Sequence, residues 1–218
     1  MYIQLDSQVL YYEKEGEGSP LILLHGNGED HTIFDALLPH LTPHFTVYSL
    51  DSRGCGLSSP SKEYHYADMA EDVAKLIRAV DIGVPSILGF SDGGIIAMLL
   101  AIRHPKLVGR LILCGANLSP KGLSFFSRQK IKSMYRKDKS DMTKMMLREP
   151  DISEADLRRI SAKTFVFAGE KDMIKEAETK KIASGIPDAT LKIIPGADHM
   201  SYIVHNDMLA NDILKFLA

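Results

Sequence analysis

Two hydrophobic patterns alternate along the chain. Short continuous apolar runs predict buried strands at residues 21–24, 45–50, 85–88, 107–114, 164–168 and 190–194. Apolar residues at helical spacing predict helices at about 33–38, 66–80, 92–104, 153–160, 173–184 and 203–217. The first of these helices is expected to end at Pro39, and Ser153 is expected to cap the fourth. Residues 2–5 and 9–13 are typical of a hairpin that turns near Asp6.

The alternation of strands and helices predicts the fold class. A strand that is apolar on both faces, such as 21–24, belongs inside a sheet that helices cover on both sides. We therefore expect an α/β fold with a mostly parallel sheet, in a single domain that spans residues 1–218. Residues 116–150 interrupt the alternation. They are rich in lysine, arginine and methionine and predict a short helical cap inserted into that domain.

Composition narrows the class of protein. The contents of hydrophobic residues (45%) and charged residues (25%) are ordinary for a globular protein, and the net charge of −2 argues against a general nucleic-acid or membrane-surface role. The N-terminus lacks a basic region followed by an apolar run, and no apolar stretch has transmembrane length, so we expect a cytoplasmic protein. Cys55 and Cys114 are expected to be reduced thiols, and no cysteine or histidine pair has metal-ligand spacing.

Ser91 lies in a predicted sharp turn. Residues 89–94 read Gly-Phe-Ser-Asp-Gly-Gly, directly after a predicted strand and directly before a predicted helix. Small residues on either side of a serine let the backbone turn tightly enough to present Oγ above the sheet edge. The spacing alone is common, but between a strand and a helix it predicts a nucleophilic serine.

A base and an acid for this serine follow two later strands. A serine hydroxyl becomes a good nucleophile only when a base accepts its proton and a carboxylate orients that base. Asp172 and His199 each come just after a predicted strand, in the order serine, acid, histidine. The carboxyl ends of parallel strands share one edge, so we expect the three side chains to converge there. Asp198 is expected to point away from His199, and residues 115–117 offer no carboxylate as an alternative acid.

Two backbone amides are expected to form an oxyanion hole. Negative charge that develops on a substrate oxygen needs N–H donors already in place. Asp92, the residue after the serine, would donate one N–H from the start of its helix. Residues 25–28 read His-Gly-Asn-Gly, a slim loop in which Asn27 is expected to donate the second N–H and His25 to shape the loop.

Five segments together resemble the α/β-hydrolase superfamily. They are residues 25–28, 51–58, 89–94, 169–172 and 196–199, and the resemblance covers nearly all of the chain from Leu21 onward. It implies an eight-stranded sheet to which the first hairpin supplies the antiparallel strand. It also implies a nucleophile, an acid and a base at Ser91, Asp172 and His199, and a structural role for the turn at 51–58.

The predicted function is hydrolysis of a small carboxylic ester, thioester or lactone, without metal or cofactor. The same residues would support perhydrolase or cofactor-free haloperoxidase chemistry, acyl transfer or carbon–carbon bond hydrolysis, and a ligand-binding receptor is the alternative from another class. Residues 117–150 carry nine basic and three acidic side chains, which indicates either a solvated face or a surface that steers anionic substrates. We expect a small-molecule partner, with no nucleic acid and no membrane; the oligomeric state stays open.

Overall fold

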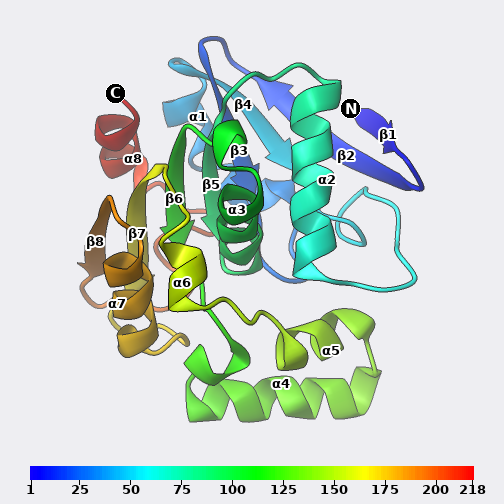
Figure 1. Cartoon of the computed structure of the whole chain (residues 1–218), viewed down its shortest axis with the longest axis vertical. Helices are drawn as coiled ribbons and strands as arrows, with labels where there is room; N and C mark the ends of the chain where they lie inside the picture. The colour runs from blue at the N-terminus through cyan, green and yellow to red at the C-terminus, as the bar shows by residue number, and fades with distance from the viewer.

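The computed structural model describes all 218 residues and contains one eight-stranded sheet, in the order β1-β2-β4-β3-β5-β6-β7-β8 (Figure 1). The first two pairs, β1 with β2 and β2 with β4, are antiparallel, and all other pairs are parallel. The predicted mostly parallel α/β sheet is therefore confirmed. The strands are β1 (Tyr2–Leu5), β2 (Gln8–Glu15), β3 (Ser19–Leu24), β4 (Phe45–Leu50), β5 (Ser86–Phe90), β6 (Arg110–Cys114), β7 (Lys163–Gly169) and β8 (Ala189–Ile194).

Helices cover both faces of the sheet. Successive residues of its central strands point to opposite sides and are apolar, so both faces must be buried. In β3, Ile22 and Leu24 pack in a core with α2 (Tyr66–Ala79), α3 (Asp92–Arg103), α6 (Glu154–Leu157) and α7 (Glu176–Gly185). Leu21 and Leu23 pack in a second core with η1 (His31–Phe34), α1 (Leu38–Leu41) and α8 (Ala210–Leu217). All four side chains have zero exposure, so each contributes about 1.5–3 kcal/mol by burial.

Two predicted helices differ from the observed ones. Residues 33–38 form no continuous helix, and Pro39 lies at the start of α1 rather than at the end of a helix. Proline has no N–H to donate, so it suits the first turn. The predicted closing helix at 203–217 is only α8, because His205, with φ 48°, interrupts the helical run. β6 and α7 each begin three residues later than predicted.

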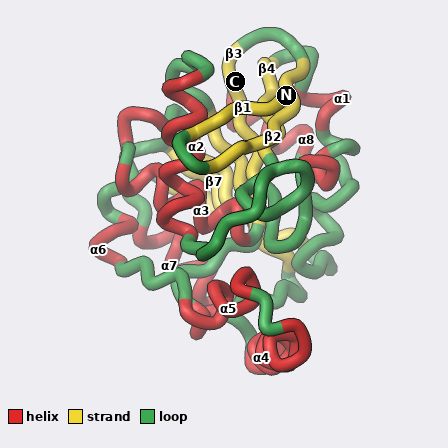
Figure 2. Tube along the Cα trace, turned by 90° about the vertical axis from the view of Figure 1, so that its right-hand side faces the viewer, coloured by secondary structure: helices red, strands yellow, loops and turns green.

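The first part of the segment between β6 and β7 lies apart from the sheet, at one end of the molecule (Figures 1 and 2). It contains η3 (Pro120–Gly122), α4 (Phe125–Asp138) and α5 (Asp141–Arg148). Leu123 pairs with Ile174 in an isolated β-bridge, and Ile131 of α4 packs on both residues. Residues 116–150 therefore rest on the loop after β7. The remaining element is η2 (Pro105–Leu107), and none of the helices combines the length and apolarity needed to cross a membrane.

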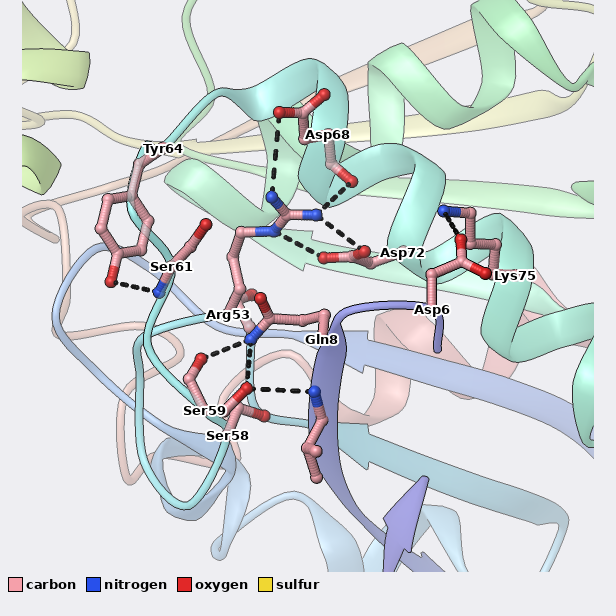
Figure 3. A network of polar contacts seen from close by, with 12 residues as sticks. Asp6, Gln8, Arg53, Ser58, Ser59, Ser61, Tyr64, Asp68, Asp72 and Lys75 are labelled. Atoms are coloured by element: carbon pink, nitrogen blue, oxygen red, sulfur yellow. Dashed lines mark hydrogen bonds and ion pairs between the residues drawn. The ribbon is translucent and has the colours of Figure 1, made fainter. Parts of the chain in front are cut away.

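The turn after β4 is fastened to α2 by a buried ion pair (Figure 3). Arg53 Nε donates to Asp72 Oδ2 at 2.7 Å and Arg53 Nη2 donates to Asp72 Oδ1 at 2.8 Å. The two side chains are only 13% and 5% exposed. On the other side of the turn, Gln8 Nε2 of β2 donates to Ser59 Oγ at 2.7 Å. These contacts join β2, the turn and α2 into one unit.

Candidate active site

Ser91 connects β5 to α3 in a strained backbone conformation. Its φ is 53° and its ψ is −114°, a combination that residues with a side chain rarely adopt. The surrounding backbone holds it there: Ser91 N donates to Cys114 O at 2.7 Å, and Ser91 O accepts from Gly94 N at 3.0 Å. The turn therefore places the side chain at the carboxyl edge of the sheet.

Close backbone contacts explain two of the glycines around Ser91. A Cβ at Gly89 would lie 2.2 Å from Gly93 O, and a Cβ at Gly93 would lie 2.1 Å from Leu24 O. Both distances are far below van der Waals contact. The first turn of α3 packs directly on β5 and on the end of β3, and only glycine permits this approach.

The three predicted side chains meet at this edge. His199 Nε2 lies 3.0 Å from Ser91 Oγ, and His199 Nδ1 lies 2.7 Å from Asp172 Oδ1. The Asp172 side chain is 2% exposed, and Oδ1 also accepts from Ile174 N at 2.8 Å, which fixes the carboxylate. A carboxylate at Nδ1 favours the tautomer with its proton there, so Nε2 can accept the proton of the serine hydroxyl. Asp198 Oδ1 instead accepts from the backbone N–H groups of Met200 and Ser201.

Gly115 makes room for the His199 ring. This glycine follows β6 directly and has a φ of +61°. A Cβ there would lie 2.8 Å from His199 Cε1 and 3.0 Å from His199 Nδ1. This role was not predicted from the sequence, where the available indication was a glycine immediately after a predicted strand.

The two residues proposed for the oxyanion hole are joined through their side chains. Asn27 Nδ2 donates to Asp92 Oδ2 at 2.8 Å, and Asp92 is buried. Burial raises the pKa of the Asp92 carboxyl, although hydrogen bonds from Asn27 and Tyr66 favour its charged form. Asn27 N–H donates to no protein acceptor. Asp92 N–H belongs to the first turn of α3, where amides lack a partner within the helix.

His25 shapes the loop that carries Asn27. The imidazole is 1% exposed, and its Nε2 accepts from Ser52 N at 2.9 Å. Because a backbone N–H can only donate, Nδ1 carries the ring proton and donates to Gly26 O at 2.7 Å. Burial lowers the pKa of His25, so the ring is neutral. His25 thereby ties the loop after β3 to the turn after β4.

Glu29 brings a further carboxylate to the site, which sequence analysis did not single out. Its Oε2 accepts from Gly26 N at 2.9 Å. A Cβ at Gly26 would lie 2.5 Å from Glu29 Oε2 and 3.2 Å from Ser91 Cβ, so the carboxylate and the serine flank the same point. Burial raises the pKa of Glu29 more than the Gly26 N–H and the nearby His199 lower it. An acidic residue in a glycine-rich loop was the available indication.

One cluster near the site has the donor types of a metal centre. Ligand atoms of Asp30, His31 and Asp51 lie within 4.8 Å of one another. The Asp51 carboxylate already accepts from His31 N and Leu57 N, each at 2.8 Å, and Asp30 Oδ1 accepts from Thr32 N at 2.9 Å. These oxygens serve the local backbone, and the cluster holds the turns together.

Comparison with known proteins gives matches to part of this chain. Residues 19–137 match the family model described as alpha/beta hydrolase fold. Over 117 residues the chain is 37% identical to Serine hydrolase BPHL of Homo sapiens, covering 50% of this chain and 40% of that protein. Over 145 residues it is 30% identical to Pyrrolizixenacetamide deacetylase of Xenorhabdus hominickii, covering 65% of this chain and 54% of that protein. The matches thus span about half of these two relatives.

Solved structures match the whole chain. The crystal structure of the enol-lactonase from Burkholderia xenovorans LB400 superposes with a TM-score of 0.84 at 20% identity, covering 100% of this chain and 99% of that one. A hydrolase from Pseudomonas aeruginosa PA01 superposes with a TM-score of 0.83 at 24% identity, covering 100% and 98%. At these identities the likeness concerns the fold.

Proposed function

The chain belongs to the alpha/beta hydrolase fold family, and from that premise we propose that it is a serine hydrolase. Its substrate is a small carboxylic ester, thioester or lactone, and the reaction passes through an acyl-enzyme on Ser91. The observation that carries the proposal is the continuous chain of contacts from Ser91 Oγ through the His199 ring to Asp172. A structural role for these residues requires no such alignment at the end of a strained turn.

In the proposed reaction, Ser91 Oγ attacks the substrate carbonyl while His199 Nε2 takes the hydroxyl proton. Asp172 holds the ring in the productive tautomer and stabilises the imidazolium that forms. His199 then gives the proton to the leaving alcohol or thiol, and the acyl group stays on Ser91. A water molecule, deprotonated by His199, attacks the acyl-enzyme and releases the acid.

The backbone N–H groups of Asn27 and Asp92 bind the oxygen of the tetrahedral intermediate in this proposal. Loss of one such donor typically costs about 3–4 kcal/mol of transition-state stabilisation. The hydrogen bond between the Asn27 and Asp92 side chains supports the assignment, because it links the two segments that carry the donors. No step of the reaction calls for a metal or an organic cofactor.

Relatives support the reaction class. The names Serine hydrolase BPHL, Pyrrolizixenacetamide deacetylase and enol-lactonase all describe hydrolysis of acyl compounds or the use of a serine. The test is a panel of p-nitrophenyl esters from acetate to octanoate, with several acyl-CoAs and lactones, on the wild type and on Ser91→Ala. Turnover by the wild type and none by the variant supports the proposal. Tight binding without turnover would instead favour the receptor alternative.

A further inference from the structure

Glu29 places next to Ser91 a carboxylate that the proposed reaction does not use. The side chain is half-buried, and its one hydrogen-bond donor is Gly26 N–H. No lysine, arginine or histidine nitrogen lies within 4.0 Å of it. The carboxylates of Asp172 and Asp72 have such a partner, in His199 and Arg53 respectively, whereas the half-buried Asp30 and Glu178 also lack one. Glu29 is thus an unpaired charge at the catalytic edge of the sheet.

The groups around Glu29 do not compensate for its charge. Asp92, at the start of α3, adds a second carboxyl nearby. The Gly26 N–H favours the charged form of Glu29, as do His199 and His205 in the segment after β8. However, His199 is neutral when it acts as a base, and His205 Nδ1 already contacts Asp35 Oδ1 at 2.9 Å. The space between Glu29 and Ser91 is therefore negative whenever Glu29 is ionised.

We propose that Glu29 is a specificity-determining residue of this site. Its carboxylate disfavours esters that bring a carboxylate or phosphate to this side of Ser91, and it favours esters that bring an ammonium group or another hydrogen-bond donor there. This inference rests on the proposed function and names its substrate class. The preference that Glu29 would impose is for cationic over anionic substrates. Steering by the basic side chains of residues 117–150 would impose the opposite preference, so one assay separates the two effects.

The test uses three esters of similar length: ethyl pentanoate, ethyl 4-aminobutanoate and monoethyl succinate. Their values of kcat/KM are measured by pH-stat titration on the wild type, Glu29→Gln and Glu170→Gln. Glutamine at position 29 keeps an acceptor for Gly26 N–H and removes the charge. Glu170 is the matched control, because its Oε2 also accepts from a glycine N–H (Gly196, 2.7 Å) but its side chain is exposed.

We expect Glu29→Gln to raise the ratio of kcat/KM for the succinate ester to that for the amino ester by about 10-fold. Glu170→Gln is expected to change that ratio less than about 2-fold, since an exposed charge is screened. If Glu29→Gln hydrolyses ethyl pentanoate but its ratio of kcat/KM for the succinate ester to that for the amino ester equals the wild-type ratio, the inference is overturned. The proposed function is unaffected by that result.

Two further measurements keep the inference testable. If Glu29→Gln fails to fold, the salt response of the wild type decides. Added salt raises the relative kcat/KM of the succinate ester if Glu29 dominates, and lowers it if the basic cap dominates. If the wild type hydrolyses none of these three esters, the proposed function is decided by the wider panel of p-nitrophenyl esters, acyl-CoAs and lactones. The Kd values of phenylboronic acids with an aminomethyl or a carboxyl substituent then decide, and a Kd ratio unchanged by Glu29→Gln overturns the inference.

Discussion

Replacement of Gly115 by alanine tests how closely the fold fits the His199 ring. The new Cβ would lie 2.8 Å from His199 Cε1 and 3.0 Å from Nδ1, so the ring must move to reach ordinary contact. That movement disturbs the contacts of 3.0 Å to Ser91 and 2.7 Å to Asp172. A displacement of about 1 Å costs roughly 100-fold in rate, so we expect kcat for ester hydrolysis to fall about 100-fold with KM little changed.

Gly115→Ala also destabilises the backbone, and a control variant separates this effect from the effect on His199. Alanine at φ +61° costs about 1–2 kcal/mol, which lowers Tm by about 2–4 °C per kcal/mol in a chain of this size. Gly83 has a φ of +82° with no atom within 4 Å of an added Cβ. Gly83→Ala should therefore lose similar stability by calorimetry and keep its kcat. Equal kcat values in Gly115→Ala and Gly83→Ala would refute this reasoning.

Three further predictions concern stability. Ser91→Gly should be more stable than Ser91→Ala by about 1 kcal/mol in urea unfolding, because glycine relieves the strained turn; equal stabilities would mean that the turn is unstrained. Arg53→Ala should lose about 3–5 kcal/mol in the same assay by leaving Asp72 buried and unpaired, and a loss below 1 kcal/mol would contradict the account. A hydrogen bond to Glu149 raises the pKa of His65. The stabilisation that this pair gives to the folded state is therefore complete below the unfolded pKa of His65, about 6.5, and disappears as the pH rises through the raised pKa. His65→Gln should therefore lose up to about 0.5 kcal/mol at pH 5.5 and nothing at pH 9, since this half-exposed pair is screened; a larger loss at pH 9 would reverse the sign.

The strands are the part of the fold that the sequence predicts best, because each carries its own apolar pattern. β4 has the predicted bounds, Phe45–Leu50. The pattern fails where a distant contact sets the backbone. Ile203 and Ala210 are both buried and lie seven residues apart, a helix-like spacing, yet Ile203 lies in a turn before α8. His205 N donates to Ile33 O at 2.8 Å, a contact between segments that no local window contains.

The candidate site divides in the same way. Ser91, Asp172 and His199 were predicted from chain order, because each follows a strand of its own and parallel strands end at one edge. Glu29 and Gly115 were missed, because their importance depends on distances between separate loops. Glu29 lies near Ser91, and Gly115 lies near His199, although each pair is far apart in the sequence.

The most direct test of the central claim is the rate of labelling by a fluorophosphonate, followed by intact-protein mass spectrometry. The claim is that His199 and Asp172 make the hydroxyl of Ser91 reactive. It predicts one adduct on the wild type, none on Ser91→Ala, and labelling of His199→Ala slower by about 1000-fold or more. A wild-type protein that stays unlabelled, or a His199→Ala variant labelled as fast as the wild type, would contradict it.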